Sequence, residues 1–175
     1  MKKLIFISLL FSILSLSVSA QKPTKAEKAA QLEQEFQQTR LLIESKHFHF
    51  DLTRVHPQGG QDLCRFNPRG KFVITDSVAK GTLPFFGRAY SLPYGEGGGI
   101  EFDGVMKDQS LKIEHKKKRK ILIYRFSITA KNDTYQISME ISGGGNCSVN
   151  LNSNNRAQIS YSGTVSPVKD ETGKS

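Results

Sequence analysis

The segment LPFFGRAYSLPYGEGGGIEFDG, residues 83–104, combines aromatic rings with an arginine and carboxylates. Exposed aromatic rings stack on sugars or acyl chains, and neighbouring polar groups orient what is bound. We expect a shallow groove here, with Phe85 or Phe86 buried beneath it. The predicted ligand-binding residues are Arg88, Tyr90, Tyr94 and Glu96. The alternative is a packed corner without a ligand, since the glycines allow the backbone to turn sharply into a strand.

A second candidate surface is the run HKKKRK at residues 115–120. Consecutive cations attract anionic polymers by Coulombic forces. The predicted anion-binding residues are Lys116, Lys117, Lys118 and Arg119. The alternative is a soluble hairpin tip, in which lysines discourage pairing of strand edges. No aromatic residues interleave with the cations, so we predict no specific nucleic-acid site.

Three possible metal ligands, His47, His49 and Asp51, recur at every second position. On a strand this spacing places them on one face, where two imidazoles and a carboxylate could converge on zinc. A metal site needs a further ligand from a neighbouring strand, and no motif supplies one. We therefore predict a solvent-facing strand surface, with no metal or cofactor bound, and keep His47 and His49 as weak candidates.

The sequence contains two cysteines, Cys64 and Cys147. In an oxidising compartment they could form a disulfide, which would close a long loop and stabilise the fold by ~4 kcal/mol. Two unpaired thiols are the alternative. Cys147 begins an alternating pattern with Val149 and Leu151, so we expect its side chain to point into the core.

Recognised catalytic motifs are absent from the sequence: there is no G-x-S-x-G elbow, no H-E-x-x-H and no phosphate loop with its lysine. Cys64 with His56 could act as a thiol and base, and the carboxylates Glu96, Glu101 and Asp103 could supply paired acids. Neither pair forms a converging constellation. The sequence favours a non-catalytic binding or accessory module for glycan, lipid or another envelope component, and the alternative is a hydrolase acting on glycan or peptidoglycan.

The first 20 residues have the pattern of a secretory signal peptide. Lys2 and Lys3 precede an apolar run that is shorter than the ~20 residues needed to cross a bilayer. We expect cleavage after Ala20 and a periplasmic or secreted protein. Residue 21 is Gln and not Cys, so no lipid anchor is expected. Peripheral association with a membrane stays open.

Removal of the signal peptide leaves a length that suits one domain. The full chain has a net charge of +9, and the loss of Lys2 and Lys3 still leaves a basic protein. We assign residues 21–46 to a flexible lead and a helix, 47–168 to an antiparallel β domain, and 169–175 to a disordered tail.

The helix is predicted to begin at Thr24, which forms a capping box with Glu27. The apolar stripe of this helix consists of Ala29, Leu32, Phe36, Thr39 and Ile43. Alternating segments then predict about eight strands: HFHFDLTRV, KFVITDSV, GIEFDGVM, SLKIEH, KILIYRFSITAK, TYQISMEIS, CSVNLNS and AQISYSGTV. Short connections imply antiparallel neighbours. The expected fold is mainly β, a curved sheet or sandwich with the N-terminal helix packed on it, and an open barrel is the nearest alternative.

The clearest local prediction is a hairpin of residues 119–130 and 134–142. Its period of two predicts Tyr135, Ile137, Met139 and Ile141 to be buried. The residues between them, Gln136, Ser138 and Glu140, should be exposed on the opposite face.

Three stretches carry a family resemblance: ESKHFHFDLTRVHPQGG, the segment at residues 83–104, and VNLNSNNRAQISYSGTVSP. In this order behind a signal peptide they resemble a family of secreted Bacteroidetes proteins, catalogued as domain of unknown function 4251. The resemblance covers nearly all of the mature chain and implies an origin in the bacterial envelope. It implies no activity or catalytic residues. Many members resemble lipoproteins, from which this chain departs because it lacks the cysteine after the signal.

Overall fold

A computed structural model describes residues 24–58, 68–91, 98–116, 119–131 and 133–168. The chain forms two units, residues 1–31 and residues 32–175. Among the described residues, no helix combines the length and the apolar character that a membrane span requires.

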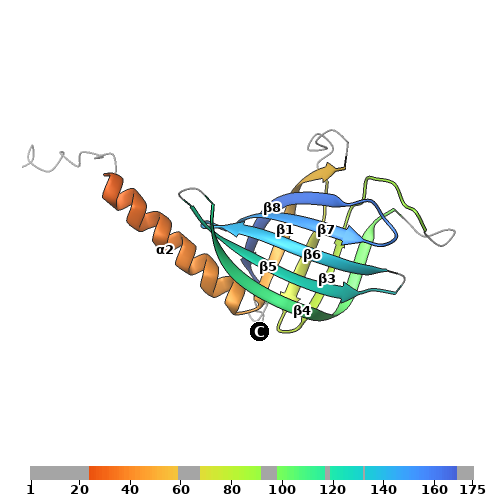
Figure 1. The fold of residues 1–175 in the computed structure, drawn as a ribbon. Coiled ribbons are helices and arrows are strands. Elements are labelled where there is room, and N and C mark those ends of the chain that lie inside the picture. Colours follow the sequence, from red (N-terminus) through yellow and green to blue (C-terminus); the bar gives the residue numbers. More distant parts are fainter. Residues whose placement is uncertain (1–23, 59–67, 92–97, 117–118, 132, 169–175) are drawn as a thin grey trace, which may run out of the picture. The chain divides into compact units, whose positions relative to one another are not determined.

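Eight antiparallel strands close into a barrel, because the last strand pairs with the first (Figure 1). The strands are β1 (His47–Pro57), β2 (Lys71–Thr75), β3 (Val78–Leu83), β4 (Ile100–Lys116), β5 (Arg119–Thr129), β6 (Thr134–Ser142), β7 (Asn146–Ser153) and β8 (Ile159–Pro167). The mainly β fold of about eight antiparallel strands is confirmed. The barrel alternative is the one observed, and it is closed.

Helix α2 (Lys25–Glu44) begins with the predicted capping box. The Thr24 backbone N–H donates to Glu27 Oε2 at 2.7 Å, and the Glu27 N–H donates to Thr24 Oγ1 at 3.2 Å. Of the predicted apolar stripe, only Phe36, Thr39 and Ile43 are buried. Leu32 is 63% exposed, so the buried stripe begins one turn later than the sequence pattern indicates.

The C-terminal half of α2 packs on the strands at the end of the barrel where the short turns lie. Phe36 and Ile43 belong to the same core cluster as the barrel interior. Lys120 at the start of β5 donates to both carboxylate oxygens of Glu33 at 2.9 Å, and its Nζ lies 5.7 Å from the centre of the Phe36 ring. The predicted packing of the helix on the sheet is thereby confirmed.

The sequence pattern placed one strand across residues 71–78, whereas the structure has two strands there. Asp76 has a positive φ of 55° and, with Ser77, forms the tight turn that joins β2 to β3. β3, with the sequence VAKGTL, was missed because Gly81 and the exposed Val78 break the alternation of apolar and polar residues.

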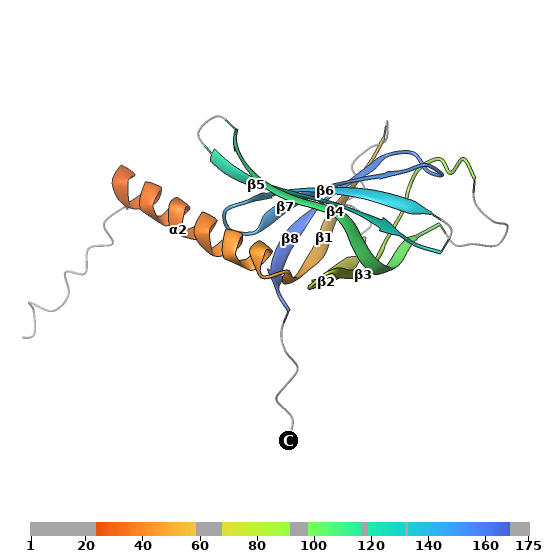
Figure 2. The ribbon, with the colours of Figure 1, turned by 60° about the horizontal axis from the view of Figure 1, so that its bottom comes forward.

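The opposite difference occurs in β4, where two predicted strands are one. The pairing of β4 with β5 shifts register between Lys107 and Ser110, and Asp108 has a φ of 52°. Such a bulge interrupts the alternation and bends the strand without ending it. Figure 2 shows β4 bending as it passes from its contact with β3 to its contact with β5.

The hairpin of β5 and β6 forms as predicted, with the predicted faces, but only one of the three residues expected to be exposed is fully so. Ile137 and Met139 are buried in the interior, and Gln136 is exposed on the outer side. Ser138 and Glu140 share the outer face with Gln136 and are half-buried. The alternation in this hairpin is regular because neither strand contains a bulge.

Large side chains fill the interior of the barrel. A series of ring contacts crosses it, from Phe50 to Phe72 at 5.1 Å, from Phe72 to Phe102 at 5.8 Å and from Phe102 to Tyr135 at 6.3 Å between ring centres. Tilted and stacked rings at these separations attract one another in addition to the apolar area that they bury. The described interior is therefore a packed core.

Two inward-facing positions hold glycine because neighbouring phenylalanines occupy the space of a side chain. A Cβ at Gly81 would overlap Phe72, its direct partner on β2. A Cβ at Gly163 would overlap the carbonyl oxygen of Asp51 and the ring of Phe50. Gly163 lies at the seam where β8 pairs with β1, so its missing side chain lets the barrel close.

We expect Gly163→Ala to lower the free energy of unfolding by about 1–3 kcal/mol, because the added methyl group overpacks the β1–β8 seam. Urea denaturation measures the change. Gly98→Ala is the matched control, since a Cβ at Gly98 meets no atom within 4 Å. Equal midpoints for the two variants would contradict the steric role of Gly163.

Candidate functional site

The segment that follows β3, residues 84–91, is anchored by backbone hydrogen bonds to the connection between β7 and β8. We call it the anchored segment. The Tyr90 N–H donates to the Asn155 carbonyl at 2.7 Å, and the Ala157 N–H donates to the Arg88 carbonyl at 2.9 Å. Between them, Ala89 and Arg156 form an isolated antiparallel bridge. Residues 88–90 therefore have a fixed backbone although they belong to no strand.

The beginning of this segment is held by Tyr161 of β8. Its buried hydroxyl donates to the Pro84 carbonyl at 2.9 Å. Burial raises the pKa of Tyr161, so the phenol stays protonated and remains a hydrogen-bond donor. Phe85 is partly buried against the core, as the sequence predicted for one of the two phenylalanines.

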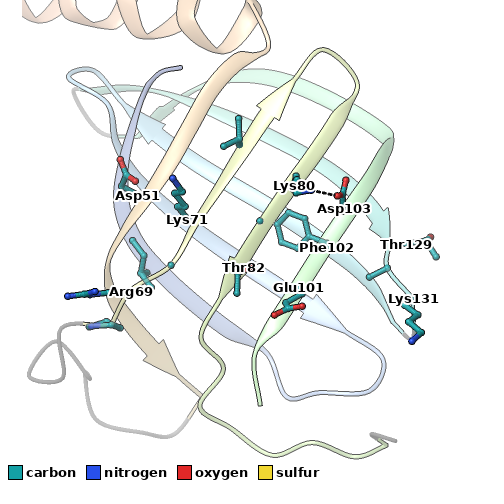
Figure 3. A pocket seen from close by; sticks show the side chains of 16 residues that line it. Asp51, Arg69, Lys71, Lys80, Thr82, Glu101, Phe102, Asp103, Thr129 and Lys131 are labelled. Atoms are coloured by element: carbon teal, nitrogen blue, oxygen red, sulfur yellow. Dashed lines mark hydrogen bonds and ion pairs between the residues drawn. The ribbon is translucent and has the colours of Figure 1, made fainter. Parts of the chain in front are cut away.

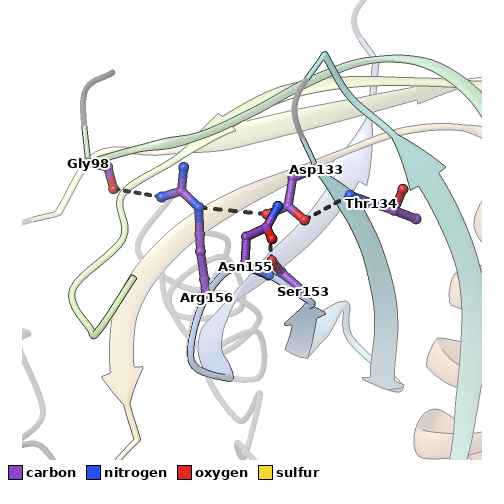
Figure 4. A network of polar contacts seen from close by, with 6 residues as sticks. All are labelled: Gly98, Asp133, Thr134, Ser153, Asn155 and Arg156. Atoms are coloured by element: carbon purple, nitrogen blue, oxygen red, sulfur yellow. Dashed lines mark hydrogen bonds and ion pairs between the residues drawn. The ribbon is translucent and has the colours of Figure 1, made fainter. Parts of the chain in front are cut away.

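Arg156 joins three connections at this end of the barrel (Figure 4). Its side chain is 5% exposed, and its guanidinium carbon lies 5.1 Å from the centre of the Phe85 ring. Nη1 donates to the Gly98 carbonyl at 3.4 Å, which is a long hydrogen bond. These contacts tie the β7–β8 connection to both ends of the β3–β4 connection.

The carboxylate nearest to Arg156 is Asp133, between β5 and β6. Asp133 Oδ2 lies 3.9 Å from Arg156 Nε, too far for a hydrogen bond, and Nε has no hydrogen-bond partner among the described residues. Asp133 is 5% exposed and accepts hydrogen bonds from Ser153 Oγ and from the Thr134 N–H. The pair is a buried ion pair whose two members are also held by neutral partners.

Three of the larger side chains in the anchored segment face solvent. Phe86 is 42% exposed and Tyr90 is 67% exposed, and Arg88 is also exposed. Two of the predicted ligand-binding residues, Arg88 and Tyr90, thus lie on one short, fixed stretch. The other two, Tyr94 and Glu96, lie outside the described residues. The ligand-binding role of all four stays a prediction.

A groove of about 1120 Å³ lies against strands β1 to β4 and residues 129–131 (Figure 3). Most of the strand residues that line it point outward, because they alternate with buried core residues: Lys71 and Val73, for example, flank Phe72. The register places Lys71 beside Thr82, and Thr82 beside Glu101. The groove therefore has a cation on β2 and a carboxylate on β4.

The groove lining contains one close ion pair. Lys80 Nζ lies 2.6 Å from Asp103 Oδ2, its direct cross-strand partner. The hydrogen bond and the charge of Asp103 raise the pKa of Lys80, so this lysine stays charged at neutral pH. Both groups are exposed, and the pair contributes little to stability.

The histidines of β1 do not form a metal site in the described part of the chain. His49 Nε2 lies 2.9 Å from Asp51 Oδ2, and His47 is exposed at the start of the strand. Among the described residues no three His, Cys, Asp or Glu side chains are grouped so that they could hold a metal ion. His49 is therefore occupied by a carboxylate on its own strand.

The basic run at residues 115–120 is partly neutralised. Lys116 Nζ lies 2.7 Å from Glu140 Oε2, and Lys120 is paired with Glu33. Arg119 is exposed, whereas Lys117 and Lys118 lie outside the described residues. The anion-binding role of this run stays a prediction.

Cys147 is buried in the barrel interior, as its alternation with Val149 predicts. Burial, and to a smaller extent the charge of Glu140, raises the pKa of the thiol, which is therefore not a thiolate at neutral pH. Cys64 lies outside the described residues, so the disulfide between the two stays a prediction. His56, the proposed base for Cys64, forms a hydrogen bond of 2.9 Å with Ser162 Oγ.

The sequence reading missed Arg156 and most of the groove. Arg156 lies in the turn NNR, where an arginine is ordinarily exposed, and no local pattern reveals its burial. Lys71, Thr82 and Glu101 are outward-facing by alternation, but their adjacency depends on the strand register. The alternation of apolar and polar residues thus predicted that these side chains are exposed, but it did not predict that they line the same groove.

The chain folds as a closed eight-stranded antiparallel barrel with a helix packed on it, and the candidate surfaces lie outside the filled interior. Residues 30–165 match the family described as "Domain of unknown function (DUF4251)", and the chain belongs to this family. No curated protein matches the sequence.

A solved structure supports the fold. The chain is similar to the crystal structure of a DUF4251 family protein from Bacteroides eggerthii, with a TM-score of 0.55 and 21% sequence identity. The similarity covers 79% of this chain and 91% of that chain. At this identity the likeness concerns the fold alone.

We expect Arg156→Met to lower the free energy of unfolding by about 3 kcal/mol, because it leaves the Asp133 carboxylate buried without its cation. Urea denaturation measures this change. The double variant Arg156→Met with Asp133→Asn should recover part of the loss. A single-variant loss below about 1 kcal/mol, the range of exposed pairs, would contradict the role of Arg156.

Proposed function

We propose that this chain is a secreted protein of the bacterial cell envelope and that it acts as a non-catalytic binding module for an envelope glycan. The observation that carries the proposal is the anchored segment. Its backbone is fixed by the β7–β8 connection and by Tyr161, while Phe86, Arg88 and Tyr90 remain exposed.

Fixed, exposed rings suit sugar recognition because they bind without a large loss of conformational freedom. Stacking uses the apolar face of a sugar ring, and a guanidinium beside the ring can donate to hydroxyl or carboxylate oxygens. A monomer rarely leaves large apolar side chains together in water unless they have a partner. We call Phe86, Arg88 and Tyr90 the aromatic platform. Phe85, beside them in the sequence, is partly buried against the core, and its ring centre lies 5.1 Å from the guanidinium carbon of the buried Arg156.

We expect Phe86→Ala and Tyr90→Ala each to weaken glycan binding about tenfold, because each removes a stacking surface. Binding is measured on a glycan array that includes peptidoglycan fragments and envelope polysaccharides, followed by calorimetry with the best probe. Arg88→Ala should weaken binding as well. The melting temperature should change little, because the replaced side chains are exposed.

Val105→Ala is the matched control, since Val105 is 60% exposed on β4 and lies outside the segment. If this control and Tyr90→Ala bound the glycan equally well, the proposed role of the platform in glycan binding would be contradicted. Binding to phospholipid vesicles in place of glycans would identify an acyl ligand instead. Cleavage of a bound glycan by the unmodified protein would contradict the non-catalytic role and favour a hydrolase.

Secretion is tested separately from ligand binding. The full chain expressed in a Gram-negative host should be recovered from the periplasm or the medium without residues 1–20, so that Gln21 becomes the first residue. Intact mass and N-terminal sequencing check this. A cytoplasmic protein that retains Met1 and the following residues would contradict the signal peptide.

A further inference from the structure

The groove on β1 to β4 is independent of the aromatic platform, because none of Phe86, Arg88 and Tyr90 lines it. Its polar groups lie in two adjacent rows across the sheet. One row runs from Asp51 through Lys71 and Thr82 to Glu101. The next runs from Val73 through Lys80 to Asp103.

The second row is satisfied within itself, because Lys80 and Asp103 form an ion pair of 2.6 Å. In the first row, neither Lys71 nor Glu101 has a charged partner within the described residues. Arg69 lines the groove near Lys71, and its guanidinium has no ion pair in the described chain either. Asp51 faces Lys71 across the β1–β2 pair and also lines the groove, but its carboxylate lies 2.9 Å from His49 Nε2. Lys131 is a further lining cation. Among the lining charges without an ion pair in the described chain, Arg69 and Lys71 thus lie at β2, and Glu101 lies on β4.

The separation of these charges follows from sheet geometry. Neighbouring strands lie about 4.8 Å apart, so the backbones at Lys71 and Glu101 are about 10 Å apart. This separation is too large for the two side chains to neutralise each other directly without stretching over Thr82. A ligand that carries opposite charges at its two ends can bridge them.

Other ligand classes fit the groove less well. A simple anion would meet Glu101 and Asp103 as well as the lysines, and a metal cation would meet Lys71 and Lys80. A neutral sugar would lack a stacking surface, because Phe102, the aromatic residue among the described lining, is only 3% exposed. Thr82, which lies between Lys71 and Glu101 in the row, is the residue that an uncharged linker would pass.

We propose that this groove binds a short zwitterionic peptide, with the carboxylate of the peptide at Lys71 and Arg69 and its ammonium group at Glu101. Opposite charges at fixed separation select both the direction and the length of such a ligand. The proposal does not depend on the glycan-binding function.

The experiment titrates the full mature chain with trialanine and follows amide chemical shifts by NMR. Matched probes are N-acetyl-trialanine, which lacks the ammonium group, and trialanine amide, which lacks the carboxylate. Trialanine should bind saturably at millimolar concentration and shift the amides of Lys71, Thr82 and Glu101. Each blocked peptide should bind about tenfold more weakly, because one charge-assisted contact is lost.

Two variants assign each charge to its partner. Lys71→Gln should weaken the binding of trialanine about tenfold and leave the binding of trialanine amide unchanged. Glu101→Gln should also weaken the binding of trialanine about tenfold, but it should leave the binding of N-acetyl-trialanine unchanged. Lys112→Gln and Glu114→Gln are matched controls, because both residues are exposed on β4 outside the groove. They should bind like the unmodified chain.

The proposal is overturned if trialanine shows no saturable binding, if the shifts map to residues outside the groove, or if both blocked peptides bind as well as trialanine. Equal affinity of the Lys71→Gln and Lys112→Gln variants for trialanine also overturns it. Proton NMR dispersion of each variant confirms that it is folded, so a loss of binding reports on the site.

Discussion

The pairing of β1 with β8 is the constraint on which the rest of the structure depends. It extends along β1 from Phe48 to Pro57 and joins the first strand to the last. Without it the eight strands would form an open sheet with two edges and a half-exposed apolar face. The seam tolerates only glycine at residue 163, because the Phe50 ring and the Asp51 carbonyl fill the adjacent space.

Closure of the barrel determines where a ligand can bind. The interior is occupied by aromatic rings, such as Phe72 and Phe102, so it is a core and not a ligand cavity within the described residues. The outer face of the strands and the connections between them remain available. The aromatic platform uses a connection, and the groove uses the outer face. The two kinds of surface suit different ligands. A connection can present aromatic rings, whereas the outer face of the strands presents rows of polar side chains.

Several surface charges form local pairs. Lys120 with Glu33, Lys116 with Glu140 and Lys80 with Asp103 are each neutralised by a neighbour. A basic net charge therefore does not by itself make an anion-binding surface. What distinguishes the groove is the separation of Lys71 from Glu101, which leaves two opposite charges facing the same space.

The sequence by itself determined the elements whose signals are local. The capping box at Thr24 and the alternation of β6 fix hydrogen bonds and faces between residues close in the chain, so both were predicted correctly. The turn at Asp76 and the bulge at Asp108 were missed, since both depend on positive φ at residues that do not require it. The predicted alternation of buried and exposed residues is nevertheless correct along most of each strand, because the turn and the bulge each interrupt it over only a few residues.

Only the tertiary structure decided the closure, the burial of Arg156 and the grouping of Lys71 with Glu101. Whether eight strands form a sandwich, an open sheet or a barrel depends on whether the first and last strands meet, and those strands are more than one hundred residues apart. Arg156 is buried because three connections converge on it. Alternation tells which side chains point outward, but neighbours on different strands are set by register, which is a property of the assembled sheet.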